Sequence, residues 1–135
     1  MLRCPYCGGE ALLKSSFEIY RDDYGYVYVC ENYPSCNSYV GTHKKTLKPL
    51  GRLANEELRK LKITAHLYFD TLWKHREKKG FSNSRTIAYK WLSEQLKINI
   101  NDTHIGYFDK ETTEKVIKLC KPYYTKIIKS KSEVY

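Results

Sequence analysis

Two short stretches decide the fold of the N-terminal part of the chain: residues 4–9, CPYCGG, and residues 30–36, CENYPSC. Their paired cysteines are Cys4, Cys7, Cys30 and Cys36. There are 2 residues inside the first pair, 22 between the pairs and 5 inside the second. Structural Zn²⁺ takes four tetrahedral ligands, and two cysteine pairs joined by a hairpin supply them. We therefore expect one Zn²⁺ held by these four thiolates, with no open position for a catalytic water.

The residues between and after the two pairs predict a small β-ribbon. Residues 11–20 and 24–30 are rich in β-branched and aromatic residues, which favour strands. The Arg-Asp-Asp at 21–23 favours a turn between them, so the two segments are expected to form a hairpin. The hairpin would carry the second cysteine pair back to the first. Residues 38–41, SYVG, are expected to form a short third strand.

The rest of the chain predicts three helices. Apolar residues that recur three and four apart predict the first helix. It is expected to begin at an N-cap on Asn55 and to end at Gly80. The second is expected from Ser82 or Ser84 to about Ile98. It would bury Ile87, Ala88, Trp91, Leu92 and Leu96. The third is expected to begin after an N-cap on Asp109, to bury the lone Cys120 and to stop before Pro122.

These elements predict an α+β chain in which a small N-terminal β zinc ribbon is packed with, or linked to, a C-terminal three-helix unit. The expected boundaries are a zinc ribbon over residues 1–42, a basic linker over 43–54, a helical domain over 55–121 and a basic tail over 122–135.

The positive charge is concentrated in the C-terminal part. Residues 1–50 hold 6 Lys and Arg against 5 Asp and Glu, whereas residues 51–135 hold 18 against 10, so the second part carries +8 of the net +9. A field of this sign attracts polyanions. The same charges are also compatible with a solvated helix surface that binds nothing.

Tyrosines and basic residues in and after the ribbon are candidate contacts to nucleic acid. Three tyrosines alternate along one expected strand and share one of its faces: Tyr24, Tyr26 and Tyr28. Val27 and Val29 would lie on the other face of that strand. The tyrosines could form a stacking platform for single strands, or equally the face that docks on the helices. The full set of candidate contacts is Arg21, Tyr26, Tyr28, Tyr33, Lys44, Lys45, Lys48 and Arg52.

The remaining residues predict no enzyme. No paired carboxylates, nucleophile triad or glycine-rich phosphate loop can be assembled from the chain. No window of about 18 apolar residues occurs, and Cys4 follows the N-terminus too closely for an apolar leader, so we expect a cytoplasmic protein without a membrane partner. The leading hypothesis is a non-enzymatic module that binds single-stranded or distorted DNA with low sequence specificity. The alternative is a phage or mobile-element factor that docks on a host enzyme.

Two resemblances support this interpretation. The second cysteine pair, Cys30-Glu31-Asn32-Tyr33-Pro34-Ser35-Cys36, resembles the C-terminal zinc ribbons of bacterial type IA topoisomerases, which implies single-stranded DNA as a ligand and Tyr33 as a base contact. The whole chain, including residues 51–66 (GRLANEELRKLKITAH), the tryptophan-containing helices and residues 103–109 (THIGYFD), resembles a zinc-finger-containing family of bacteria and their phages. That resemblance implies the fold and a bacterial or phage-infected host cell, and it implies no activity.

Overall fold

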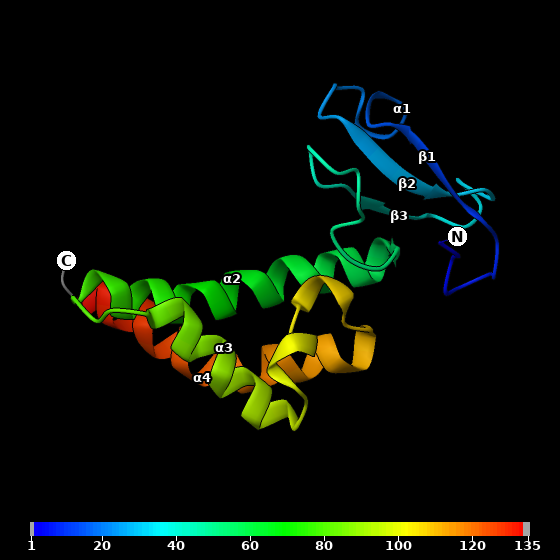
Figure 1. The fold of residues 1–135 in the computed structure, drawn as a ribbon. Coiled ribbons are helices and arrows are strands. Elements are labelled where there is room, and N and C mark those ends of the chain that lie inside the picture. The colour runs from blue at the N-terminus through cyan, green and yellow to red at the C-terminus, as the bar shows by residue number, and fades with distance from the viewer. Residues whose placement is uncertain (1, 134–135) are drawn as a thin grey trace. The chain divides into compact units, whose positions relative to one another are not determined.

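The computed structural model describes residues 2–133 of the 135-residue chain. The chain divides into two compact units, Met1–Arg59 and Lys60–Tyr135, which we call the ribbon unit and the helical unit (Figure 1). The first contains an antiparallel sheet and the second is made of helices, which confirms the predicted α+β class.

The sheet of the ribbon unit has four strands in the order β1-β2-β3-β4, all antiparallel. Its strands are β1 (Ala11–Ser15), β2 (Tyr26–Cys30), β3 (Ser38–Gly41) and β4 (Ala54–Asn55). The predicted hairpin is confirmed by the pairing of β1 with β2, in a register that sets Ala11 opposite Cys30. This register places the second cysteine pair beside the first.

The first strand is shorter than predicted because the chain turns at Ser16. The Ser16 hydroxyl is buried, donates to the Asp22 carbonyl at 2.9 Å and accepts from the Tyr24 amide at 2.6 Å. These bonds close a loop that contains the short helix α1 (Phe17–Tyr20). The predicted turn at residues 21–23 is therefore the end of a helical turn rather than a two-strand connection.

Residues 43–54, for which the sequence predicts a basic linker, are ordered by the ribbon unit. A hydrogen-bonded turn spans residues 43–48, and the Leu50 amide donates to the Gly41 carbonyl at 2.9 Å. Leu53 is fully buried and packs with Cys4, Ala11 and Cys30. The strand β4 then pairs with β3. Residues 43–54 therefore have a defined structure because Leu53 is buried and β4 pairs with β3.

The helical unit contains most of α2 (Glu56–Lys78) together with α3 (Ser84–Leu96) and α4 (Lys110–Glu133). Two short 3₁₀ turns, η1 (Ile100–Asp102) and η2 (Ile105–Tyr107), connect α3 to α4. The helices α2 and α4 run in the same direction (Figure 1). The buried core of the unit consists of Ala65, Phe69, Leu92, Ile105, Phe108, Val116 and Cys120. The predicted burial of Cys120 is confirmed.

Both predicted helix caps are present. The Asn55 carboxamide oxygen accepts from the Leu58 amide at 2.9 Å, and an Asp109 carboxylate oxygen accepts from the Thr112 amide at 2.8 Å. Each side chain satisfies an amide that has no partner within its own helix. Asn55 therefore ends β4 and also begins α2.

Two predictions about the helices are wrong. The last helix does not stop before Pro122 but continues through it to Glu133, so the described part of the expected basic tail is helical. Tertiary contacts offset the missing proline N–H, because Tyr123 meets Trp91 edge to face and Tyr124 stacks on Tyr68 at 4.2 Å between ring centroids. Ile87 is not buried but 53% exposed. Its side chain lines a hollow instead of contacting a covering helix.

No helix within residues 2–133 is long and apolar enough to cross a membrane.

Candidate metal centre and nucleic-acid interface

The sulfur atoms of Cys4, Cys7, Cys30 and Cys36 all lie within 4.8 Å of one another. The Cys4 and Cys36 sulfurs are 3.5 Å apart, and the Cys7 and Cys30 sulfurs are 3.4 Å apart. Tetrahedral Zn²⁺ with Zn–S bonds of about 2.3 Å would hold its sulfurs about 3.8 Å apart. The four cysteines are thus positioned to hold one metal ion, and an all-thiolate set of this size suits Zn²⁺.

The first cysteine pair lies on a turn that requires its two glycines. The Cys4 amide donates to the Gly9 carbonyl at 2.8 Å, and the Gly8 amide donates back to the Cys4 carbonyl at 2.9 Å. Gly8 has a φ of +77°, which side chains rarely adopt. A Cβ at Gly9 would lie 3.0 Å from the Asn32 side-chain nitrogen and 3.3 Å from the Cys7 sulfur. A side chain at residue 9 would therefore press on the metal site itself.

Asn32 and Ser38 surround the sulfurs with polar groups. The Asn32 side chain donates to the Cys7 sulfur at 3.4 Å, and the Asn32 backbone amide donates to the Cys30 sulfur at 3.4 Å. The Ser38 hydroxyl lies 3.1 Å from the Cys4 sulfur. Such outer partners orient thiolate ligands and offset part of their negative charge.

The thiol pKa values of the protein without metal differ strongly within the site. The hydrogen bond from Asn32 is the largest influence on Cys7 and lowers its pKa to about 6. Burial raises the pKa of Cys30 to about 12. Because Zn²⁺ binds thiolates, its binding here would release the protons that these thiols carry.

The three predicted lysine contacts lie together. Lys44, Lys45 and Lys48 are exposed and line one open hollow of about 430 Å³ with His43 and Thr46. We call residues 43–48 the lysine turn. The His43 amide donates to the Lys48 carbonyl at 2.8 Å, and the Leu47 amide donates to the His43 carbonyl at 2.9 Å. The backbone of the lysine turn is thus fixed by its own hydrogen bonds.

Tyr26 adjoins the lysine turn, and Tyr28 has a different role. The Tyr26 side chain is 50% exposed, and its carbonyl accepts from the Thr42 hydroxyl at 2.9 Å, one residue before the turn. Tyr28 is half-buried and packs against the core of the ribbon unit. The exposed Tyr26 side chain is therefore accessible to a ligand, whereas the Tyr28 side chain packs in the ribbon unit.

The other predicted contacts do not line the hollow of the lysine turn. Arg21 is exposed at the C-terminal end of α1, in the left-handed conformation with a φ of 63°. Arg52 is half-buried, and its Nε is a buried atom without a hydrogen-bond partner among residues 2–133. Tyr33 is half-buried and contacts the ring of Tyr39 edge to face.

An aromatic cluster that the sequence analysis missed contains Tyr33. The rings of Tyr24 and Tyr20, of Tyr20 and Tyr39, and of Tyr39 and Tyr33 meet edge to face, with centroids 5.9, 5.7 and 6.3 Å apart. We call these four residues the tyrosine row. Tyr24 and Tyr20 are 66% and 46% exposed. Partial burial, and next the neighbouring Tyr39, raise the pKa of Tyr20 to about 12.

The predicted strand alternation wrongly placed Tyr24 on the same strand face as Tyr26 and Tyr28. Because β2 begins at Tyr26, Tyr24 precedes the strand and its ring contacts Tyr20 of α1 instead of following the alternation. Tyr39 pairs with Val29 in the sheet and therefore shares the face of Val29, opposite Tyr28. The only sequence signal for the row was the high number of tyrosines, 13 in the chain.

Comparison with known proteins agrees with the metal site. A family model described as a zinc-finger-containing domain matches residues 1–123, which include all four cysteine ligands and reach into α4. Comparisons with curated proteins and with solved structures found no match. The chain thus carries a zinc-binding module and belongs to the zinc-finger-containing domain family.

Proposed function

We propose that the ribbon unit binds single-stranded or distorted DNA with low sequence specificity, and that the protein is not an enzyme. The observation that carries the proposal is the lysine turn, which presents three exposed lysines. Tyr26, which is also exposed, is bonded through its carbonyl to Thr42, the residue before this turn. Lysines that follow a backbone of phosphates, and aromatic rings that stack on bases, are the two components of single-strand binding.

The lysine turn suits phosphate because its charges are concentrated and uncompensated. Within residues 2–133, the side chains that line its hollow include no carboxylate. The hydrogen-bonded backbone of the turn keeps the three lysines near one another, which lowers the entropy lost on binding. Contacts of this kind position a strand without reading its sequence.

Exposed tyrosines of the same unit can supply stacking. Tyr26 adjoins the lysine turn, and the tyrosine row offers two further exposed rings, Tyr20 and Tyr24. Stacking of a base on an aromatic side chain contributes about 1–3 kcal/mol and tolerates any base. Residues 60–135 hold 16 Lys and Arg against 8 Asp and Glu, so the helical unit adds a net +8 that attracts a polyanion over longer distances.

The metal centre supports a structural role for zinc. The four cysteines would supply all four ligands of a tetrahedral Zn²⁺, which would leave the ion no position at which to activate water or polarise a substrate. Zinc binding would instead contribute folding free energy to the ribbon unit.

A salt titration of DNA binding tests the proposal. The zinc-loaded protein is titrated with labelled single-stranded and double-stranded oligonucleotides of DNA and RNA at several salt concentrations. We expect log affinity to fall linearly with log salt. Replacing Lys44, Lys45 and Lys48 by Gln should reduce the slope by up to about 2, since each phosphate contact on a single strand contributes about 0.7.

A matched control distinguishes the loss of phosphate contacts from the loss of net positive charge. Replacing the exposed Lys90, Lys121 and Lys129 by Gln removes the same charge from the helical unit and should change the slope much less. Tyr26→Ala should weaken binding by about 1–3 kcal/mol at an unchanged slope. The proposal fails if the wild-type protein does not bind at low salt, or if both triple variants behave alike.

A further inference from the structure

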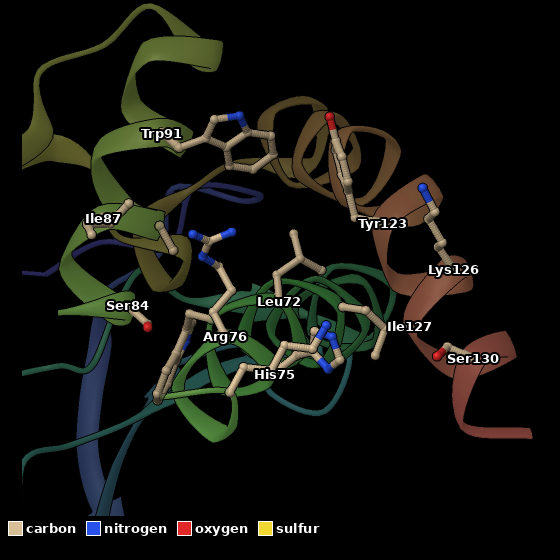
Figure 2. Close-up of a pocket in the computed structure, with 13 residues that line it drawn as sticks. Leu72, His75, Arg76, Ser84, Ile87, Trp91, Tyr123, Lys126, Ile127 and Ser130 are labelled. Carbon is tan, nitrogen blue, oxygen red and sulfur yellow. The ribbon is translucent and has the colours of Figure 1, made fainter. Parts of the chain in front are cut away.

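The helical unit has an open groove between α3 and α4, above α2. Two neighbouring hollows of about 620 and 670 Å³ both include Trp91 and Tyr123 in their walls. We call the two together the Trp91 groove. Figure 2 shows the first hollow, with Trp91 on α3, Tyr123 on α4 and Leu72 between them on α2. Hollows of this size lie within the range of pockets that bind ligands.

The walls of the groove are largely aliphatic and aromatic. Leu72, Ile87, Ala88 and Ile127 line the first hollow with Trp73, Trp91 and Tyr123. Ile87 and Tyr123 are each 53% exposed. The rings of Trp91 and Tyr123 are 5.9 Å apart and perpendicular, so they do not form a parallel slot for a flat base. Exposed apolar side chains gathered in one groove mark a surface that binds a partner.

Basic residues also line the groove. The first hollow is lined by Arg76, Lys79 and Lys126, and the second by Lys97, Lys115 and Lys118. Neither set of described lining residues contains Asp or Glu. Lys115 has an ion pair at 3.9 Å with Glu111, which lies outside the groove, so its charge is partly compensated.

His75 also lines the first hollow. Burial lowers the pKa of His75, and the next largest contribution comes from the positive charge of Lys79. A ligand that combines apolar groups with negative charge would therefore suit the lining of this groove.

We propose that the Trp91 groove binds an acidic amphipathic α-helix of a partner protein. An amphipathic helix places aliphatic side chains at positions i, i+3, i+4 and i+7 on one face, which matches an aliphatic groove between two helices. Glu and Asp on its flanks would meet Arg76, Lys79 and Lys126 around the first hollow and the lysines that line the second. Trp, Tyr and Arg, which dominate binding energy at protein interfaces, are all present here.

The aliphatic part of this groove suits nucleic acid poorly. Aliphatic side chains such as Leu72, Ala88 and Ile127 offer no flat face on which a base can stack. The proposal goes beyond DNA binding and does not depend on it, because the lysine turn and the Trp91 groove belong to different units.

Selection from a peptide library tests the proposal. The zinc-loaded full-length protein is used to select from displayed 16-residue helical peptides of random sequence, and selected peptides are synthesised and titrated. We expect enrichment of peptides with an aliphatic stripe and net negative charge. Ile87→Asp should weaken their binding at least tenfold, because it places a charge in the apolar wall. This variant should fold, since Ile87 is exposed and lies near the N-terminal end of α3, where an acidic residue is favourable.

A charge-reversal pair completes the test. Arg76→Glu with Lys126→Glu should also weaken binding at least tenfold, whereas Lys90→Glu, an exposed position on α3 outside the groove, should have little effect. The variant with Gln at residues 44, 45 and 48 should bind the peptides normally, so loss of DNA binding leaves this result intact.

The proposal is overturned if no peptide is enriched, if the enriched peptides are neutral or basic, or if Ile87→Asp leaves their affinity unchanged. It is also overturned if Ile87→Asp weakens binding of a single-stranded oligonucleotide and leaves peptide binding unchanged, which would assign the groove to nucleic acid.

Discussion

The guanidinium of Arg59 lies 3.9 Å from the centre of the Tyr39 ring. The same group donates to the Ala54 carbonyl at 2.7 Å and to the backbone and side-chain oxygens of Asn37 at 3.0 and 2.9 Å. Arg59, in the first turn of α2, is thus hydrogen-bonded to the residue before β3 and to a residue of β4. These contacts attach the first turn of α2 to the rest of the ribbon unit, which includes Arg59.

Replacing Arg59 should therefore destabilise the ribbon unit. We expect Arg59→Ala to cost about 2–4 kcal/mol, because it removes several charge-assisted hydrogen bonds and a cation–π contact. Arg59→Lys should recover part of this, since an ammonium retains the charge but lacks the planar fork. The measurement is zinc release during urea denaturation. If Arg59→Ala matches the exposed control Lys44→Ala, the contacts contribute nothing measurable.

The metal centre predicts one zinc per chain. Cys30→Ser should abolish zinc binding and unfold the ribbon unit, because the ion supplies much of the folding free energy of so small a unit. Cys120→Ala is a matched control, since it also removes a buried thiol but lies in the helical unit. Elemental analysis should give equal zinc for this control and the wild-type protein. Zinc retained by Cys30→Ser would contradict the assignment.

Burial of Cys120 predicts a decrease in stability at alkaline pH. Its pKa is raised to about 12 in the folded protein, against about 8.5 for a free thiol. Below pH 8.5 the thiol is neutral in both states, so its contribution to stability is fully present. Above that pH the unfolded chain ionises and the folded protein does not, so stability falls by about 1.4 kcal/mol per pH unit.

The alanine variant isolates this effect from other titrations. Cys120→Ala should be less stable than the wild type at pH 7.5 because of the cavity, and the difference should shrink between pH 8.5 and 10. Urea denaturation of the helical unit at several pH values measures it. Parallel curves for the two proteins would show that Cys120 ionises equally in both states.

The metal site could be predicted from sequence because its determinants are local. Each cysteine pair occupies a short turn, and the β-branched and aromatic residues between the pairs indicated the hairpin that joins them. The helix caps at Asn55 and Asp109 were predictable for the same reason, since a cap depends on amides only three residues away. The period of the apolar residues likewise indicated the three helices.

Features that depend on distant contacts were not predictable. The tyrosine row joins residues of α1, the following loop, β3 and the second cysteine pair, which no periodic pattern connects. The exposure of Ile87 could not be foreseen either, because its spacing in α3 is that of a core residue. The apolar period shows which face of a helix is hydrophobic, but it does not show whether another helix covers that face.

Pro122 allows a further test of how α4 is stabilised, because the sequence rule predicts that the helix ends there and the structure shows that it continues. The rule predicts that a helix ends before proline, yet α4 continues to Glu133. Proline cannot donate a hydrogen bond to the carbonyl four residues earlier, at Lys118. We expect Pro122→Ala to restore that bond and to stabilise the helical unit by about 1–3 kcal/mol, somewhat less than the intrinsic helix cost of proline.

Thermal denaturation with the neighbouring Lys121→Ala as control measures this effect, and the control should change stability by no more than about 0.5 kcal/mol. The alternative is that the distortion at Pro122 places Tyr123 against Trp91 and Tyr124 against Tyr68. In that case Pro122→Ala would straighten α4, separate these rings and lower stability. A destabilised variant would therefore show that proline is required for the aromatic packing of α4.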